Sequence, residues 1–289
     1  MTAEITEEGA AGAVIDSFAG TADPRLREVL SSLVTHLHGF VREVRPTITE
    51  WEQAIGFLTE TGHTCDAVRQ EFILLSDVLG VSMLVETINN RTAGDATEST
   101  VLGPFHVVAS PPRDLGDTID LVGDSEPCVV TGRVTSPDGT PLPGAVLDVW
   151  QADDKGFYDV QQPGVQPEGN GRGLFIADGE GRFWFRTVVP RYYPIPADGP
   201  VGALLTATGR HPYRPAHIHF IVSAAGHRTL TTHIFVADSA YIDSDAVFAV
   251  RKSLVTEFRK VEDASEAERY GVASPFRHAD FGIVLQPLG

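Results

Sequence analysis

The stretch RPAHIHF, residues 214–220, places His217 and His219 two positions apart in an apolar run. In a β-strand, successive side chains point to opposite faces of the sheet, so both imidazoles would lie on one face and Ile218 on the other. Such a pair can offer two nitrogen ligands to one metal ion. It can equally be two half-buried histidines that are satisfied by hydrogen bonds, and the HxH pattern alone leaves both interpretations open.

Two tyrosines occupy positions from which they could complete a metal site. Tyr158 closes the stretch VWQADDKGFY just after a predicted strand, and Tyr193 lies in RYYPIPADGP, where prolines on both sides of Ile195 stiffen the chain. Each tyrosine alone is more simply explained as a structural residue. Two imidazoles with two phenolates, however, would form a donor set suited to ferric iron rather than to zinc or calcium. A phenol with an ordinary pKa of about 10 ionises at neutral pH only beside such a strong Lewis acid.

Other metal and cysteine patterns are absent from the sequence. The HxH strand of cupins needs a nearby downstream glutamate, and none occurs between His219 and Ser253. Cys65 and Cys128 show no CxxC spacing, so neither a disulfide framework nor a thiolate metal site is indicated. Any metal in this chain is therefore expected to use nitrogen and oxygen ligands.

The composition narrows the classes of partner. The 289 residues carry a formal net charge of −17, from 39 acidic and 22 basic residues, which disfavours nucleic acid and anionic membrane surfaces. The first residues are acidic where a secretory signal would be basic, and no apolar run approaches the roughly 18–20 residues of a membrane span. The expected location is the cytoplasm.

The chain divides into a helical region, residues 1–100, and a β-rich region, residues 101–289. Helical periodicity begins at Asp23-Pro24, which are expected to form the cap and first turn of a helix. A second helix is expected after a capping box of Thr49 and Glu52, and a long third helix is expected through EFILLSDVLGVSMLVETINN. Because the third segment is apolar on several faces, part of this region is expected to cover a second subunit.

The β-rich region has the pattern of a β-sandwich. Short apolar runs alternate with turns rich in Gly and Pro. The predicted strands are CVVTGRVTS, GAVLDVWQAD, RFWFRTVV, AHIHFIVSA and TLTTHIFVA. A late helix is predicted over residues 243–261, in DSDAVFAVRKSLVTEFRKV. The fold class is therefore mainly β, with a helical N-terminal linker or dimerisation domain.

On these motifs the sequence resembles the intradiol ring-cleavage dioxygenases, the family of catechol and hydroxyquinol 1,2-dioxygenases. VWQADDKGFY, RYYPIPADGP and GRHPYRPAHIHF are similar to the family's iron motifs, and EFILLSDVLGVSMLVETINN and GDATESTVLGPF are similar to its hydroxyquinol-type branch. The resemblance implies one ferric iron per subunit, held by Tyr158, Tyr193, His217 and His219. It also implies a homodimer formed through the N-terminal helices, with phospholipid as a further candidate at the interface.

The reaction implied by the resemblance is cleavage of hydroxyquinol between its adjacent hydroxylated carbons by dioxygen, which gives 3-hydroxy-cis,cis-muconate or its tautomer maleylacetate. Tyr193 is implied to leave the iron when substrate arrives, while Tyr158 stays bound. Arg214 is expected to stabilise charge on the ring; its alternative role is a salt bridge that holds the Pro215 turn. The residues expected to line the substrate pocket are Leu74, Asp77, Val101, Leu102, Gly103, Pro104, Phe105, Ile195, Pro196 and Val247.

Several alternatives remain open at this stage. Catechol or a chlorocatechol is the alternative substrate, and GRVTSPDGTPLPGAVLDVW also resembles non-catalytic β-sandwich binding modules. His106 stands after GPF where the hydroxyquinol-type branch commonly has an aromatic residue, and His233 stands where catechol-type enzymes have Gln. Asp77 is expected to accept a hydrogen bond from the third hydroxyl of hydroxyquinol, or else to pair structurally with Arg69 or Arg91.

Overall fold

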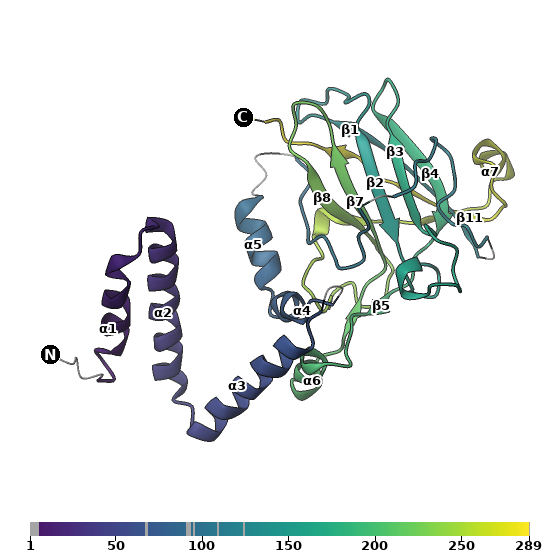
Figure 1. Cartoon of the computed structure of the whole chain (residues 1–289). Helices are drawn as coiled ribbons and strands as arrows, with labels where there is room; N and C mark the ends of the chain where they lie inside the picture. Colours follow the sequence, from purple (N-terminus) through teal and green to yellow (C-terminus); the bar gives the residue numbers. More distant parts are fainter. Residues whose placement is uncertain are drawn as a thin grey trace. The chain divides into compact units, whose positions relative to one another are not determined.

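The computed structural model describes residues 6–66, 69–90, 94, 96–108, 110–123 and 125–288. The chain forms two compact units, residues 1–60 and residues 61–289. Figure 1 shows helices in the first unit, and in the second a β-sandwich with further helices. No helix in the described part of the chain combines the length and the apolar character needed to cross a membrane.

The first unit consists of helices α1 (Ala10–Ser17), η1 (Phe18–Gly20), α2 (Pro24–Val44) and most of α3 (Ile48–His63). Asp23 caps α2 as predicted, because its carboxylate accepts the N–H groups of Arg25 and Leu26. The capping box predicted at Thr49 and Glu52 is wrong. The helix begins earlier, so Thr47 is the N-cap: its hydroxyl accepts the Glu50 N–H, and the Glu50 carboxylate accepts the Thr47 N–H at 2.7 Å.

The long third helix predicted from residue 71 to residue 90 is also wrong. The segment forms two helices, α4 (Glu71–Val78) and α5 (Val81–Asn89), which are separated by Leu79 and Gly80. Gly80 has a φ of +73°, a left-handed conformation that interrupts an α-helix and that glycine adopts at little cost. Asp77 consequently lies in the last turn of α4 rather than in the middle of a helix.

Two five-stranded sheets form the sandwich. One sheet has the order β10-β11-β1-β12, with β4 paired to β1, and the other has the order β3-β2-β7-β8-β9. Each of the five predicted strand segments contains a strand (β1, β2, β4, β7, β8). The strand bounds are β1 (Pro127–Thr135), β2 (Val146–Gln151), β3 (Arg172–Ile176), β4 (Arg182–Val188), β5 (Tyr193–Pro194), β6 (Tyr213–Arg214), β7 (His217–Ser223), β8 (Leu230–Val236), β9 (Val255–Thr256), β10 (Arg259–Val261), β11 (Phe276–Asp280) and β12 (Ile283–Val284).

The remaining helices are α6 (Pro200–Ala207), α7 (Ala264–Tyr270), η2 (Asp159–Gln161) and η3 (Lys252–Leu254). The late helix predicted over residues 243–261 is wrong, since this segment forms a loop followed by η3, β9 and β10. The Asp245 carboxylate accepts the N–H groups of Val247 and Ala249, and Phe248 has a φ of +59°. Both features belong to a tight loop and are incompatible with a continuous helix.

The alternation along β7 determines where a site can form. Ile218, Phe220 and Val222 are buried in the main core with residues of the other sheet, and the Phe220 ring lies 6.2 Å from that of Phe183 on β4. His217 and His219 therefore project from the opposite face of their sheet, as the HxH spacing predicts. Antiparallel pairing places Trp150 of β2 and His233 of β8 on either side of His219.

Candidate metal and substrate site

The four predicted metal ligands lie together on the outer face of the sheet that contains β7. The Tyr158 hydroxyl lies 3.0 Å from His219 Nε2 and 3.5 Å from the Tyr193 hydroxyl. The Nε2 atoms of His217 and His219 are 3.1 Å apart. All four side chains are almost completely buried. The four candidate ligands are thus neighbours in space, although they span 62 residues of chain, from Tyr158 to His219.

The surroundings of the two HxH histidines favour the neutral form that binds metals. His217 Nδ1 donates to the Pro215 carbonyl at 2.7 Å, which leaves the lone pair of Nε2 directed toward the site. Burial lowers the pKa of both imidazoles well below the usual value. Nearby cationic groups, with Arg214 among them, act in the same direction. Both rings therefore offer nitrogen lone pairs at neutral pH.

The buried phenol of Tyr158 requires a cation if it is to ionise. Burial raises the pKa of Tyr158 well above its ordinary value, and the neighbouring Tyr193 raises it further. Without a strongly charged partner this hydroxyl would remain protonated at any physiological pH. A ferric ion between the two phenols and the two imidazoles would supply that partner, so the donor set fits the metal that the sequence implies.

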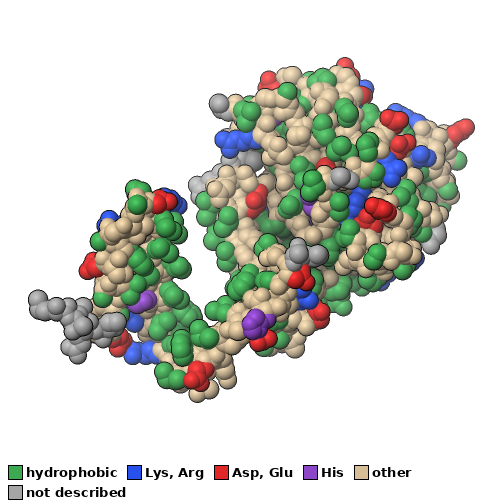
Figure 2. Space-filling view, viewed as in Figure 1, with side chains coloured by type: hydrophobic (Ala, Val, Ile, Leu, Met, Phe, Trp, Pro, Cys, Tyr) green, Lys and Arg blue, Asp and Glu red, His purple; other side chains and the backbone are tan. Residues whose placement is uncertain are grey.

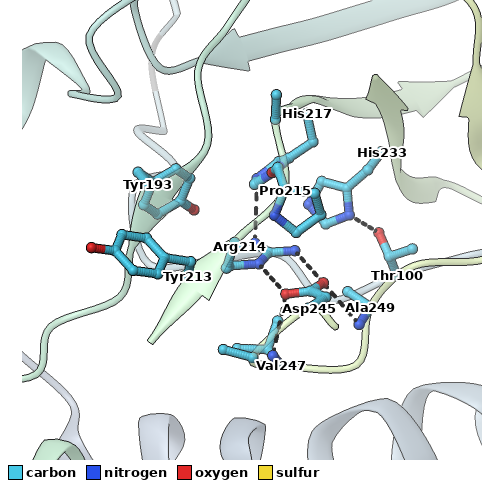
Figure 3. A network of polar contacts seen from close by, with 12 residues as sticks. Thr100, Tyr193, Tyr213, Arg214, Pro215, His217, His233, Asp245, Val247 and Ala249 are labelled. Atoms are coloured by element: carbon cyan, nitrogen blue, oxygen red, sulfur yellow. Dashed lines mark hydrogen bonds and ion pairs between the residues drawn. The ribbon is translucent and has the colours of Figure 1, made fainter. Parts of the chain in front are cut away.

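Arg214 lies beside the donor set and is fixed by an ion pair. Strands β5 and β6 pair Tyr193 with Arg214, and Arg214 Nε lies 3.2 Å from the Asp245 carboxylate (Figure 3). Arg214 Nη1 lies 3.3 Å from His217 Nε2. Although burial opposes the charge, Asp245 and the two tyrosines raise the pKa of Arg214, so the guanidinium stays cationic. Arg214 thus makes the predicted alternative contact, a salt bridge, and at the same time faces the candidate ligands.

The loop at residues 101–105 approaches His219. A β-carbon added to Gly103, whose φ is +78°, would lie 2.9 Å from His219 Cε1, so both the backbone conformation and the available space require glycine. Phe105 stacks on the ring of Tyr158, with a centroid separation of 4.6 Å. Val101 packs against the main core, while Leu102 is exposed. Pro104 belongs to the turn between Gly103 and Phe105.

The other predicted pocket residues come from three segments. Leu74, Ile195 and Val247 are buried members of the main core, and Pro196 is half-buried. Asp77 on α4 is also half-buried. Burial raises the pKa of Asp77, whereas a hydrogen bond from Ser82 and the charge of Arg214 lower it.

The structural alternative for Asp77 finds no support in the described residues. Arg69, one of its two expected partners, pairs instead with Glu71 at 2.9 Å and with Asp198 at 2.9 Å. Arg91, the other, lies outside the described residues. The fully buried Glu71 also accepts the N–H of Val201 at the start of α6, which ties α4 to the segment that carries Ile195.

The structure adds residues that sequence reasoning did not assign to the site. The ring of Trp150 stacks on His219 with centroids 4.5 Å apart, and Asp245 holds Arg214. His233 is completely buried, and its ligand nitrogen lies within 4.8 Å of those of His217 and His219. The strand alternation in TLTTHIFVA could have assigned His233 to the ligand face. Nothing local in the sequence indicates Asp245.

His106, the other departure from the family pattern, contacts Asp148 and Trp150. Its Nε2 lies 3.0 Å from the Asp148 carboxylate, and its ring packs against the edge of Trp150 with centroids 4.8 Å apart. His106 therefore supports the indole that stacks on His219.

Sequence and structure comparisons place this chain among dioxygenases. It matches the family described as "Dioxygenase" over residues 106–287 and the family "Catechol dioxygenase N terminus" over residues 23–97. It is 55% identical over 280 residues to a hydroxyquinol 1,2-dioxygenase of Rhizobium sp. (strain MTP-10005), which covers 96% of this chain and 95% of that one. It is 50% identical to a 6-chlorohydroxyquinol 1,2-dioxygenase of Cupriavidus pinatubonensis, with 95% of each chain covered.

A solved structure gives the same result. The hydroxyquinol 1,2-dioxygenase from Pseudomonas putida DLL-E4 is 47% identical and superimposes with a TM-score of 0.92, covering 98% of this chain and 99% of that one. The chain therefore belongs to the intradiol ring-cleavage dioxygenase family, and it is an enzyme of that class with a helical N-terminal region and a sheet-rich C-terminal domain.

Proposed function

We propose that this enzyme opens the ring of hydroxyquinol between its adjacent hydroxylated carbons. Both atoms of dioxygen enter the product, 3-hydroxy-cis,cis-muconate, which tautomerises to maleylacetate. The observation that carries the proposal is the convergence of two phenols and two imidazoles beside Arg214, in a chain whose relatives include hydroxyquinol and 6-chlorohydroxyquinol dioxygenases.

Tyr158, Tyr193, His217 and His219 are proposed to hold one ferric iron per subunit. When bound, the iron would act as a Lewis acid. It would favour loss of the diol protons and so make the ring reactive toward dioxygen. Two anionic oxygens and two neutral nitrogens suit this ion, whereas zinc sites favour Cys, His and carboxylate ligands. Tyr158, which is held by Phe105 stacking, is proposed as the permanent phenolate ligand.

The remaining groups handle protons and charge. Tyr193 is proposed to leave the metal when the diol enters, and its oxygen would then accept a proton from a diol hydroxyl, because a phenolate that no longer binds a cation is a base. Arg214 keeps a positive charge beside the site because Asp245 compensates its burial. This charge would stabilise negative charge that builds on the ring.

Asp77 is proposed to select the substrate. Ser82 gives the half-buried Asp77 carboxylate one hydrogen bond, but a carboxylate can accept several, and the third hydroxyl of hydroxyquinol would be a further donor. Catechol lacks this group and would leave the carboxylate without that hydrogen bond. Leu74, one turn earlier on α4, and the predicted residues 101–105, Ile195, Pro196 and Val247 would form the walls around the ring.

The helical region, residues 1–100, is proposed as the linker and dimerisation domain, and residues 101–289 as the catalytic domain. The family matches at residues 23–97 and 106–287 support this division. Helix α2 exposes an apolar stripe at Leu26, Val29, Leu33, Leu37, Phe40 and Val44, at helical spacing. Figure 2 shows hydrophobic side chains, in green, gathered along the helices of the first unit. A second copy of the chain is proposed to cover the stripe, and phospholipid is a further candidate there.

A substrate panel tests the proposed function. The purified protein is loaded with ferric iron and assayed by oxygen uptake on hydroxyquinol, catechol and a chlorocatechol, with iron content and the visible spectrum recorded in parallel. We expect a red-brown phenolate-to-iron absorption and the highest kcat/KM on hydroxyquinol. Highest activity on catechol or a chlorocatechol would reassign the substrate. A colourless protein that stays inactive after iron loading would instead indicate a binding module.

A further inference from the structure

The site contains a third imidazole, His233, that the proposed iron ligand set does not use. His233 lies opposite His219 in the β7–β8 pairing, and the two ring centroids are 4.1 Å apart. Its Nδ1 forms a hydrogen bond with the hydroxyl of Thr100, as Figure 3 shows. Its Nε2 is buried and has no hydrogen-bond partner among the described residues. Buried polar atoms in folded proteins nearly always have a hydrogen-bond partner, so we expect this atom to bond to a group that enters the site.

The partner of Nδ1 indicates which tautomer is present. A neutral imidazole carries one N–H, so one ring nitrogen donates and the other accepts. Thr100 is buried, and His233 Nδ1 is the sole acceptor found for its hydroxyl among the described residues. If Nδ1 donated, the hydroxyl hydrogen would be left buried without an acceptor, which is unfavourable. The arrangement therefore favours a threonine that donates to Nδ1 and an N–H on Nε2.

This tautomer distinguishes His233 from His217. His217 donates through Nδ1 to a carbonyl, which can only accept, so its Nε2 keeps the lone pair that a metal needs. An N–H on Nε2 of His233 has no lone pair available for a cation. It can, however, donate to an oxygen atom that is placed next to the ligand set.

We propose that His233 is a hydrogen-bond donor to an oxygen of the bound diol, and that Thr100 is the positioning residue that fixes its tautomer. The inference rests on the proposed function, because it requires a diol at this site. One hydrogen bond to a buried substrate oxygen would contribute roughly tenfold in affinity. His233 would thereby orient the diol, while Arg214, beside His217, supplies positive charge.

The test measures iron content and diol affinity without turnover. Hydroxyquinol is titrated into the iron-loaded protein in the absence of dioxygen, and the change in the visible absorption gives the Kd. His233→Leu removes the donor, and His233→Gln retains an N–H donor. Thr100→Val removes the hydroxyl, and Thr100→Ser retains it. Thr232→Val is the matched control, because Thr232 is an equally buried threonine on β8 whose hydroxyl donates to the Glu98 carbonyl.

We expect His233→Leu to raise the Kd about tenfold and Thr100→Val to raise it about threefold or more. His233→Gln, Thr100→Ser and Thr232→Val should stay within about twofold to threefold of the parent, and all variants should retain iron.

Loss of iron in both His233 variants would make His233 a ligand and overturn the inference. A Kd within twofold of the parent in His233→Leu and Thr100→Val, with iron retained, would also overturn it. A parent protein that retains iron but binds no diol would overturn the proposed function along with it.

Discussion

The two units depart from the usual distribution of polar and apolar residues in opposite ways. The first unit leaves large apolar side chains in water, with Leu33 57% exposed and Phe40 58% exposed. The second unit buries groups that normally lie at the surface, including Arg214, Asp245 and three neighbouring histidines. Burying apolar surface is favourable and burying charge is costly, so both departures reduce stability if the chain stands alone. Each is explained if something else binds there, a second subunit in one case and a metal with its substrate in the other.

The largest expected effect concerns the buried histidines. His217→Ala and His219→Ala should each reduce bound iron to a small fraction of the parent's and abolish turnover, because three ligands hold a metal far less tightly than four. Iron per subunit is measured by elemental analysis after dialysis. His227→Ala is the control, since His227 is a hydrogen-bonded histidine outside the ligand set, bound to Ser136. Full iron occupancy with full turnover in either variant would remove that histidine from the ligand set.

The two tyrosines should respond differently when each loses its hydroxyl. Tyr158→Phe should remove most of the charge-transfer absorption that persists in the substrate complex. Tyr193→Phe should mainly remove the part that is lost when substrate binds, because this phenolate is proposed to leave the metal. Visible spectra of the iron-loaded variants, recorded with and without hydroxyquinol under anaerobic conditions, separate the two. Identical spectral changes in both variants would contradict the separate roles.

The exposed stripe of the first unit is tested by placing charge on it. Leu33→Glu with Phe40→Glu should convert a dimer into a monomer, because carboxylates buried in an apolar interface cost several kcal/mol, or more than a hundredfold in the dissociation constant. Light scattering coupled to gel filtration gives the mass. Thr35→Glu, an exposed position on the other side of α2, is the control and should leave the mass unchanged. A monomeric parent would contradict the proposed dimer, and lipid extraction with mass spectrometry tests for phospholipid in the parent.

Local patterns predicted much of this fold and of the candidate site. The alternation in AHIHFIVSA fixed the ligand face of β7, because a period of two is a property of the strand itself. Helix ends were less well predicted: Thr47 rather than Thr49 caps α3, and Gly80 divides the third helix. Both errors concern backbone conformations that a single glycine or hydroxyl decides, and apolar periodicity carries no information about them.

Long-range partners could not be predicted from the sequence. Asp245 lies in a stretch with apolar residues at helical spacing, yet its carboxylate binds Arg214, 31 residues away, and folds the segment into a loop. Thr100 and His233 are 133 residues apart and meet only because the chain before the sandwich runs beside β8. Such pairs depend on the tertiary fold. The same two contacts hold Arg214 and His233 in the site.

A smaller effect is expected in substrate choice. Asp77→Ala should reduce the ratio of kcat/KM on hydroxyquinol to that on catechol by at least tenfold, because the loss of a hydrogen bond to a buried group affects only the substrate that has the hydroxyl. Asp77→Asn keeps the shape and one acceptor and should lie between the parent and the Ala variant. A ratio unchanged within about threefold in Asp77→Ala, with circular dichroism unchanged, would return Asp77 to a structural role.

The smallest expected effect is on stability, and it tests whether Asp77 is retained for function. Because burial raises the pKa of Asp77 in the folded protein, the folded state holds this proton more tightly than the unfolded chain does. As the pH rises from the ordinary Asp value of 3.8 through the raised folded pKa, the carboxyl ionises in a poor environment and stability is lost. Asp77→Asn is neutral at every pH, so it should raise the Tm by about 1–3 °C near neutral pH, and the gain should shrink as the pH is lowered toward the folded pKa. Thermal melts of the iron-loaded parent and variant, recorded from about pH 8 to about pH 5, measure the difference.

A variant that is less stable than the parent near pH 8 would mean that Arg214 and Ser82 compensate the charge fully, in which case Asp77 would be a satisfied structural residue. A gain in stability together with a reduced preference for hydroxyquinol would show that the second unit retains a costly buried charge because the substrate completes it.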